Sequence, residues 1–212
     1  MNLSSNPLDM LPKVGTKPCR RDTVFRKVTL RLLPLLCLLY LVNILDRGNV
    51  SFAKLQLPVE LGIDEGVYSL GAGIFFISYA ALGVPSNLIL SRTGARRWIA
   101  LIMIGWGTVS AGMMLIAGPW SFVLLRLALG CAEAGFFPGI VLYLTYWFPV
   151  RERARAVALF MAASPLAGIV GGPLAGAFLQ YADGMGGLAG WQWLFLLEGA
   201  PAMLLGAIVW FF

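Results

Sequence analysis

Residues 156–182 read AVALFMAASPLAGIVGGPLAGAFLQYA and contain no Asp, Glu, Lys or Arg. A helix that crosses the hydrocarbon core of a bilayer, about 30 Å thick, needs roughly 20 mostly apolar residues. Three further stretches, 66–91, 98–125 and 134–150, also lack charged side chains. They do not alternate polar and apolar residues as the strands of a membrane barrel do. The chain is therefore predicted to be an all-α integral membrane protein.

The composition of the whole chain agrees with this interpretation. Of 212 residues, 59% are hydrophobic and 12% are charged, against about 45–50% and 25% in soluble domains. We predict a basic tail at residues 1–31 and a six-helix domain at residues 32–212. The predicted transmembrane helices are 30–53, 68–90, 98–117, 122–148, 156–181 and 191–212.

The basic residues lie on one side of this topology. Thirteen Lys and Arg residues fall in the tail and in the second and fourth loops, and the opposite side holds only Lys54. Because basic loops stay in the cytoplasm, both termini are predicted to be cytoplasmic, in a multi-pass protein of the bacterial inner membrane. Trp191 and Trp193 are predicted to be interfacial anchors. The net charge of +6 forms no single surface, so we expect the lipid bilayer and not nucleic acid as a partner.

Several absences exclude enzymatic chemistry. The chain has no His, which removes a Ser-His or Cys-His nucleophilic pair and the commonest zinc ligand. It also lacks a Gly-x-Ser-x-Gly turn and a phosphate-binding glycine loop with Lys. We therefore expect neither an enzyme nor a metal site nor an organic cofactor. Cys19, Cys37 and Cys131 are not expected to form disulfides.

Four charged side chains lie inside the predicted spans: Asp46 and Arg47 in the first, Arg126 and Glu133 in the fourth. Each costs roughly 2.5–3.5 kcal/mol to insert, so each is expected to face a cavity or a partner. Arg126 and Glu133 are seven residues apart, which places them on one helix face and about 10.5 Å apart in depth. Asn43, one turn earlier, points to roughly the same face as Asp46 and Arg47.

Two interpretations of these charges remain open. In the structural one, two ion pairs join the first and fourth spans. In the functional one, an arginine is held while a neighbouring carboxylate is charged, and it becomes available to a substrate carboxylate when that group is protonated. The functional interpretation makes the proton a coupling ion for anion transport.

Motifs along the chain carry a family resemblance. Residues 40–53, YLVNILDRGNVSFA, resemble the first-helix signature of the anion:cation symporter family of the major facilitator superfamily, a pattern close to YxDRxNxSxA. Residues 126–135, RLALGCAEAG, resemble its fourth-helix motif. Residues 135–168 resemble the tartrate, phthalate and hydroxyphenylacetate permeases, and residues 191–202, WQWLFLLEGAPA, are similar to their sixth helix.

This resemblance implies a fold and a function. Such transporters have two six-helix halves, each a pair of three-helix inverted repeats, and work by alternating access. The chain corresponds to the N-terminal half. The resemblance implies proton-coupled symport of a small organic carboxylate anion, such as a tartrate-, phthalate- or sugar-acid-like or galactonate-like molecule. The missing C-terminal six-helix half, or a partner chain, would supply the other wall of the site.

The resemblance also implies residue roles. Asp46 and Glu133 become candidates for proton coupling. The resemblance implies substrate binding by Arg47, Arg126 and Tyr79. Asn43, from its face of the first span, and Ser164, just before Pro165, are further candidates for substrate binding. Tyr79 could equally be a packing hydroxyl in the middle of a helix.

Residues 87–97, NLILSRTGARR, depart from the family's inner-loop pattern G-x-L-x-D-R-x-G-R-R. Asn87 replaces the first Gly, and Ser91 replaces the Asp to which a gating interaction is usually assigned. The pattern's remaining members are Arg92, Gly94, Arg96 and Arg97. An inner-gate role and a purely topological role both fit these residues.

Residues 168–176, GIVGGPLAG, are similar to the family's fifth-helix motif. Small residues let helices approach closely, so this motif is interpreted as a packing surface. Its members are Gly168, Gly171, Gly172, Pro173 and Gly176. In the sixth span, Glu198 precedes Pro201 by three residues. It is a candidate for a third buried carboxylate, but its position near the outer interface leaves its role open.

A second class of function also fits the chain. It could be a non-transporting six-helix assembly or sensor module that kept the transporter fold. The charges in the first and fourth spans argue against this alternative, because they are costly to keep in a bilayer.

Overall fold

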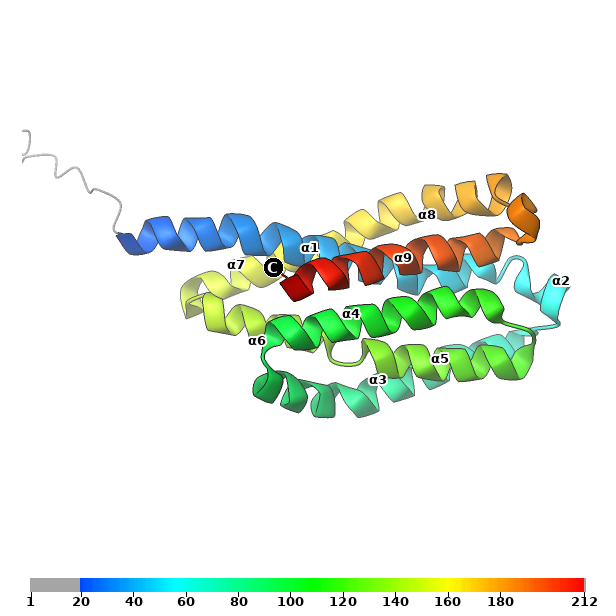
Figure 1. The fold of residues 1–212 in the computed structure, drawn as a ribbon, viewed down its shortest axis with the longest axis horizontal. Helices are drawn as coiled ribbons and strands as arrows, with labels where there is room; N and C mark the ends of the chain where they lie inside the picture. The colour runs from blue at the N-terminus through cyan, green and yellow to red at the C-terminus, as the bar shows by residue number, and fades with distance from the viewer. Residues whose placement is uncertain (1–19, 212) are drawn as a thin grey trace, which may run out of the picture.

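The computed structural model describes residues 20–211, and the regular elements in this part of the chain are all helices, without a strand. It contains six helices long and apolar enough to cross a membrane (Figure 1). They lie at Thr29–Ala53, Glu65–Thr93, Ala95–Leu115, Pro119–Trp147, Val150–Tyr181 and Gly190–Phe211. The predicted all-α membrane fold with six spans is confirmed.

The helices follow the chain in a simple order. They are α1 (Arg20–Ala53), α2 (Leu57–Leu61), α3 (Glu65–Thr93), α4 (Ala95–Gly112), η2 (Met113–Leu115), α5 (Pro119–Glu133), α6 (Phe136–Trp147), α7 (Val150–Met161), α8 (Ala163–Tyr181), η3 (Met185–Gly187) and α9 (Gly190–Phe211). Helix α1 thus begins inside the predicted tail. Most of that tail, including Cys19, lies outside the described residues, and the predicted boundary at residue 31 stays a prediction.

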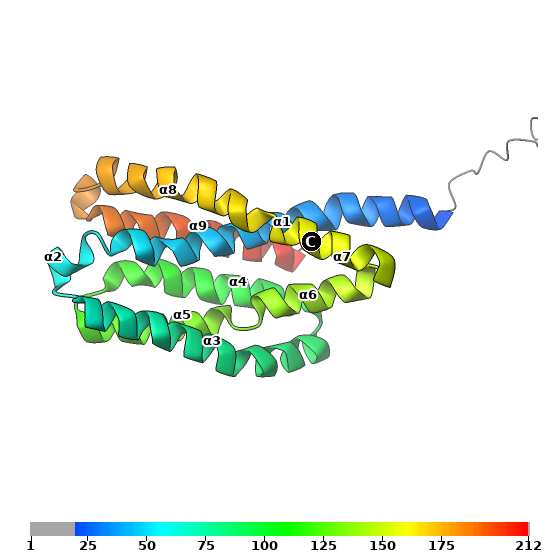
Figure 2. The same cartoon turned by 180° about the vertical axis from the view of Figure 1, so that it is seen from behind.

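The packing of the helices reflects an inverted repeat. The most extensive contacts are α4 with α9, α3 with α5, α1 with α8, α1 with α9, and α4 with α5. The first three spans (α1, α3, α4) correspond in order to the last three (α5–α6, α7–α8, α9). Under this correspondence the α3–α5 contact matches α1–α8, the α1–α9 contact matches α4–α5, and the α4–α9 contact matches itself. Figure 1 shows α4 and α9 in front, and Figure 2, from behind, shows α1 between α8 and α3.

The fourth span is broken near the middle of its length. We predicted one helix over 122–148, but α5 ends at Glu133 and α6 begins at Phe136. Gly135 has φ 87°, a conformation that glycine adopts without a Cβ penalty. A Cβ atom at Gly135 would also overlap Ser86 of α3. The break therefore directly follows the buried carboxylate of Glu133.

Glycines bring α4 and α9 into backbone contact. A Cβ atom added at Gly199 would lie 2.7 Å from the backbone nitrogen of Ala111 and 2.8 Å from the carbonyl oxygen of Gly107. A Cβ atom at Gly206 would lie 2.9 Å from Ile104. Close approach through small residues replaces the hydrophobic driving force that helices lack in lipid.

Most glycines of α8 do not make the close backbone approach that the glycines of α9 make to α4. We predicted packing at Gly168, Gly171, Gly172, Pro173 and Gly176. A Cβ atom at Gly171 would lie 3.0 Å from Leu45 of α1. At the other three glycines it would meet no described atom within 4 Å, and Pro173 is exposed. Of the four predicted glycines of α8, only Gly171 makes such an approach to another described helix, so packing by the other members of the motif stays a prediction.

Candidate functional site

An ion pair between the first and fourth spans forms the centre of the site. Arg47 Nε donates to Glu133 Oε2 at 2.7 Å, and Asn43 Nδ2 donates to the same oxygen at 3.1 Å. Asn43 and Arg47 are four residues apart and therefore neighbours on one face of α1. The Glu133 side chain is 0% exposed and that of Arg47 is 26% exposed. The carboxylate is thus sealed in the protein while its arginine keeps access to the surroundings.

Arg126 lies on the same helix as Glu133 but has a different environment. Its Nε donates to the Gly71 carbonyl of α3 at 3.4 Å, and its Cζ lies 4.4 Å from the centre of the Phe75 ring. Among the ion pairs of residues 20–211, Arg126 takes part in none. Of the two ion pairs considered from the sequence, the structure therefore contains one. Arg126 has no carboxylate within ion-pair distance among the described residues, although Glu133 and Asp46 act on it electrostatically.

Asp46 points away from Arg47. Consecutive residues on a helix are about 100° apart, and the Asp46 carboxylate turns toward α4, where Ser110 Oγ donates to its Oδ1. Asp46 is 1% exposed, and it interacts electrostatically with Glu133, Glu198 and Arg126. The carboxylate that holds Arg47 is thus Glu133 and not its neighbour in sequence. No cluster of metal-binding type occurs in the described part of the chain.

Two aromatic rings of α3 contact the arginines. The Cζ of Arg47 lies 4.6 Å from the ring centre of Tyr79 and 5.5 Å from that of Phe75. Phe75 therefore lies against both arginines, a contact in which the negative face of the ring attracts the cation. Tyr79 was singled out from the sequence and Phe75 was not. Its position one turn before Tyr79, on the same face of α3, is a signal that could have identified it.

Ser164 lies at the side of the site formed by α1 and α8. Its hydroxyl is close enough to interact with the Tyr40 phenol, which in turn interacts electrostatically with Arg47 and Tyr79. The Tyr40 ring stacks on Phe160 of α7 with centres 4.4 Å apart. The structure thus brings Asn43, Arg47, Tyr79, Arg126, Glu133 and Ser164 into one region, with Tyr40 and Phe75 added to it.

The predicted inner-gate residues form a separate group at the turn between α3 and α4. Gly94 has φ 88° and separates the two helices. The side chains of Arg92, Arg96 and Arg97 are exposed, and no ion pair of the described residues includes them. Their gating role stays a prediction.

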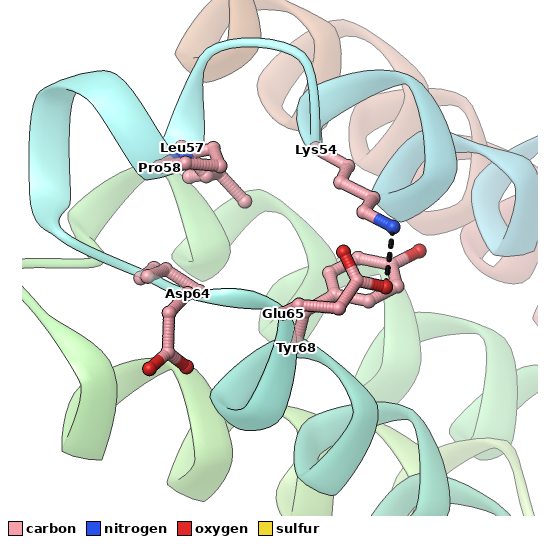
Figure 3. Close-up of a pocket in the computed structure, with 7 residues that line it drawn as sticks. Lys54, Leu57, Pro58, Asp64, Glu65 and Tyr68 are labelled. Carbon is pink, nitrogen blue, oxygen red and sulfur yellow. Dashed lines mark hydrogen bonds and ion pairs between the residues drawn. The ribbon is translucent and has the colours of Figure 1, made fainter.

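A polar network lies at the opposite end of the bundle. Lys54 Nζ forms an ion pair with Glu65 Oε1 at 2.7 Å and lies 4.8 Å from the ring centre of Tyr68. Figure 3 shows this pair above the Tyr68 ring, with Asp64 pointing away. Asp64 instead accepts from the Val67 amide at 2.8 Å and caps α3. This network joins the end of α1 to the start of α3.

Trp191 belongs to the same end but is not the predicted interfacial anchor. It is 2% exposed, and its Nε1 donates to Glu60 Oε2 of α2 at 2.7 Å. Its backbone amide donates to Gln56 Oε1 at 3.1 Å. The prediction from aromatic enrichment at interfaces was wrong here, because the indole is used to tie α9 to the α1–α3 connection.

Comparisons with known proteins identify a family and relatives of this chain. Residues 36–212 match the family model described as Major Facilitator Superfamily. The chain is 54% identical over 189 residues to a protein of Agrobacterium vitis named a tartrate transporter, covering 89% of this chain and 42% of that protein. It is 50% identical to the metabolite transport protein NicT of Pseudomonas putida, covering 92% and 43%, and 43% identical to the inner membrane transport protein RhmT of Escherichia coli, covering 90% and 44%.

A solved structure agrees in fold. A bacterial homologue of the human lysosomal transporter Spinster, in an inward-facing and occupied conformation, superposes with a TM-score of 0.74 at 23% identity, covering 88% of this chain and 44% of that one. The chain spans somewhat less than half the length of the curated relatives it matches. The family and these names are those of transporters, which confirms the prediction that the chain is not an enzyme.

Proposed function

The chain belongs to the major facilitator superfamily, and on that premise we propose that it forms the N-terminal half of a proton-coupled symporter for a small organic carboxylate. The names of its relatives, among them a tartrate transporter, support an organic acid as substrate. The substrate would bind between this half and a second six-helix half or partner chain, and alternating access would follow from rocking of the halves. Both termini would be cytoplasmic, in the bacterial inner membrane.

The observation that carries this proposal is the Arg47–Glu133 pair. A sealed carboxylate holds an arginine that still has 26% of its side chain exposed. When Glu133 takes up a proton, it loses the charge that attracts Arg47, and the guanidinium can then bind a substrate carboxylate in its planar, bidentate geometry. Proton uptake and anion binding at Arg47 would therefore favour each other.

Arg126 supplies the second positive charge of the proposed anion site. Its guanidinium is buried, lies against Phe75, and forms no ion pair in the described chain. A buried cation whose neighbouring carboxylates form no direct ion pair with it is costly, so an anionic substrate would relieve that cost when it binds. Asp46 would serve as a second proton-binding group, because it is buried next to the same charges.

The test uses a polypeptide of the relatives' full length that contains this chain, reconstituted into proteoliposomes. Glu133→Gln should abolish uptake driven by a pH gradient while exchange of substrate across the membrane continues. Arg126→Ala should weaken substrate affinity in both assays, whereas Arg151→Ala, an exposed basic residue of α7, should not. Proton-driven uptake that survives in Glu133→Gln would contradict the coupling role. A protein that carries no organic acid at all would favour the non-transporting module.

A further inference from the structure

A second group of buried polar side chains lies apart from the Arg47–Glu133 pair, where α1, α4 and α9 meet. Asp46 and Asn49 come from α1, Ser110 from α4 and Glu198 from α9. All four are at most 5% exposed. Asp46 was assigned above to proton coupling, but the role of Glu198 beside it is not explained by the anion site.

Glu198 is buried, and Asn49 is the polar side chain close to its carboxyl group. No hydrogen bond of good geometry reaches either carboxyl oxygen from the described residues, and no ion pair of this part of the chain includes Glu198. It lines a groove between α1, α8 and α9 whose other side chains are apolar: Val42, Leu45, Leu174, Phe178, Leu197 and Pro201. An ionised carboxylate in such surroundings is strongly disfavoured, whereas a carboxylic acid that carries its proton has no net charge to desolvate.

Glu198 and Asp46 lie at the same depth. Glu198 is eight residues after the start of α9 at Gly190, and Asp46 is seven residues before the end of α1 at Ala53. At a rise of about 1.5 Å per residue, these positions are about 12 Å and about 10.5 Å from the same end of the bundle. The Glu198 carboxyl acts electrostatically on Asp46, and α1 packs against α9, so the charge of Glu198 is felt by Asp46 across this contact.

The polar groups around Glu198 come mainly from α1. Asn49 is three residues after Asp46, on the same face of α1, and its amide is close enough to interact with the Glu198 carboxyl. From α4, Ser110 donates to Asp46. Of α8, the residues along the groove are Leu174 and Phe178, neither of which titrates. The charges acting on Asp46 are those of Glu133, Glu198 and Arg126, so a proton on Glu198 removes one of the two negative charges that act on Asp46.

We propose that Glu198 is a third proton-binding carboxyl of this half, which exchanges a proton with Asp46 across the α1–α9 interface. In the exchange, the O–H bond of the Glu198 acid breaks, the proton passes to a carboxylate oxygen of Asp46, and Glu198 becomes the carboxylate. Glu198 lies at the groove beside α8, and Asp46 lies next to the charges of the anion site. The pair would thus join that groove to the Arg47–Glu133 region, which deepens the proposed function and rests on its proton coupling.

The first experiment measures proton binding directly on the chain reconstituted in bilayers. Infrared difference spectra recorded during a pH titration report the C=O stretching bands of protonated carboxyl groups. Glu198→Gln should remove one such band and shift the titration of the band assigned with Asp46→Asn. Glu198→Asp should restore a carboxyl band. The control Glu152→Gln, on an exposed carboxylate of α7, should leave the buried bands unchanged.

The outcomes separate this inference from the proposed function. Buried carboxyl bands that are identical in the wild-type chain and in Glu198→Gln would overturn the inference. A Glu198 band that titrates at the same pH in the wild type and in Asp46→Asn would also overturn it. In the full-length transporter, Glu198→Gln should lower the number of protons carried per substrate and flatten the pH dependence of uptake, with exchange unaffected. If Glu133→Gln abolishes coupling while Glu198→Gln keeps the wild-type proton number, the inference fails and the proposed function stands.

Discussion

Two ion pairs in this protein have the same length and opposite surroundings. Arg47–Glu133 joins α1 to α5 in the middle of the bundle, and Lys54–Glu65 joins the end of α1 to the start of α3, both with nitrogen and oxygen 2.7 Å apart. The side-chain exposures are 26% and 0% in the first pair and 37% and 73% in the second. Geometry alone would rank the two pairs as equal.

The difference teaches that the surroundings decide what an ion pair does. Water around Lys54 and Glu65 solvates each charge nearly as well as the partner does, so breaking the pair changes little. Glu133 has no such solvent, so a change of its charge must be answered by a rearrangement of Arg47. The exposed Lys54–Glu65 pair suits local anchoring, whereas the buried Arg47–Glu133 pair can couple proton binding to a movement of the arginine.

The largest effect is expected from Glu133→Ala. Removing one partner of a buried ion pair leaves an uncompensated charge, with a cost of about 3–5 kcal/mol in fully buried cases. Because Arg47 keeps 26% exposure, we expect the lower end, about 3 kcal/mol. Thermal unfolding of the purified chain in detergent, followed by circular dichroism, measures the loss. The double variant Arg47→Met, Glu133→Leu should recover part of the lost stability, because it removes both charges. A Glu133→Ala chain as stable as the wild type would contradict the expected cost of leaving Arg47 without its partner.

An intermediate effect is expected from Gly199→Ala, at the backbone contact between α4 and α9. Gly199→Ala would place a Cβ atom 2.7 Å from a backbone nitrogen of α4, and such overpacking costs about 1–3 kcal/mol. Gly172→Ala is the matched control, because its added Cβ meets nothing within 4 Å. Gly172→Ala should leave the Tm unchanged or raise it, since alanine is the better helix former. Equal destabilisation by both variants would contradict the α4–α9 contact.

The smallest effect is expected from Lys54→Met. This change removes the exposed ion pair and keeps most of the side chain's length, and it should cost about 0–1 kcal/mol. Raising the ionic strength from 0.1 M to 1 M shortens the Debye length from about 10 Å to about 3 Å. The small difference in Tm between wild type and Lys54→Met should therefore shrink in high salt, whereas the Glu133→Ala difference should persist. A large, salt-independent loss in Lys54→Met would remove the contrast between the two pairs.

Much of the architecture could be predicted because hydrophobic length is a local property. The first span was predicted at 30–53 and is found at Thr29–Ala53, and the last was predicted at 191–212 and is found at Gly190–Phe211. The break after Glu133 could not be predicted, because hydropathy continues through residues 134–136 without change. It depends on Gly135 meeting Ser86 of another helix, a contact between residues far apart in sequence.

The candidate site shows the same division. The charges at Asp46, Arg47, Arg126 and Glu133 were identified from the sequence, since ionisable residues are rare and costly within spans. Ion pairs between the first and fourth spans were one interpretation of the sequence, but helical periodicity did not show which carboxylate holds which arginine, nor that Asp46 turns to Ser110. Trp191 is a related case: aromatic enrichment at interfaces predicted an exposed anchor, and the structure buries it against Glu60.

The sequence by itself therefore determined that this chain is a six-helix membrane protein with charged side chains in its first and fourth spans, because the bilayer imposes length and polarity on every segment separately. Only the tertiary structure decided that Glu133 holds Arg47, that Asp46 turns to Ser110, and that Arg126 rests on Phe75 without an ion pair in the described chain. The physical reason is that the low-dielectric interior makes the energy of each charge depend on its few nearest neighbours. Those neighbours come from other helices, and their positions follow from packing and not from any one segment.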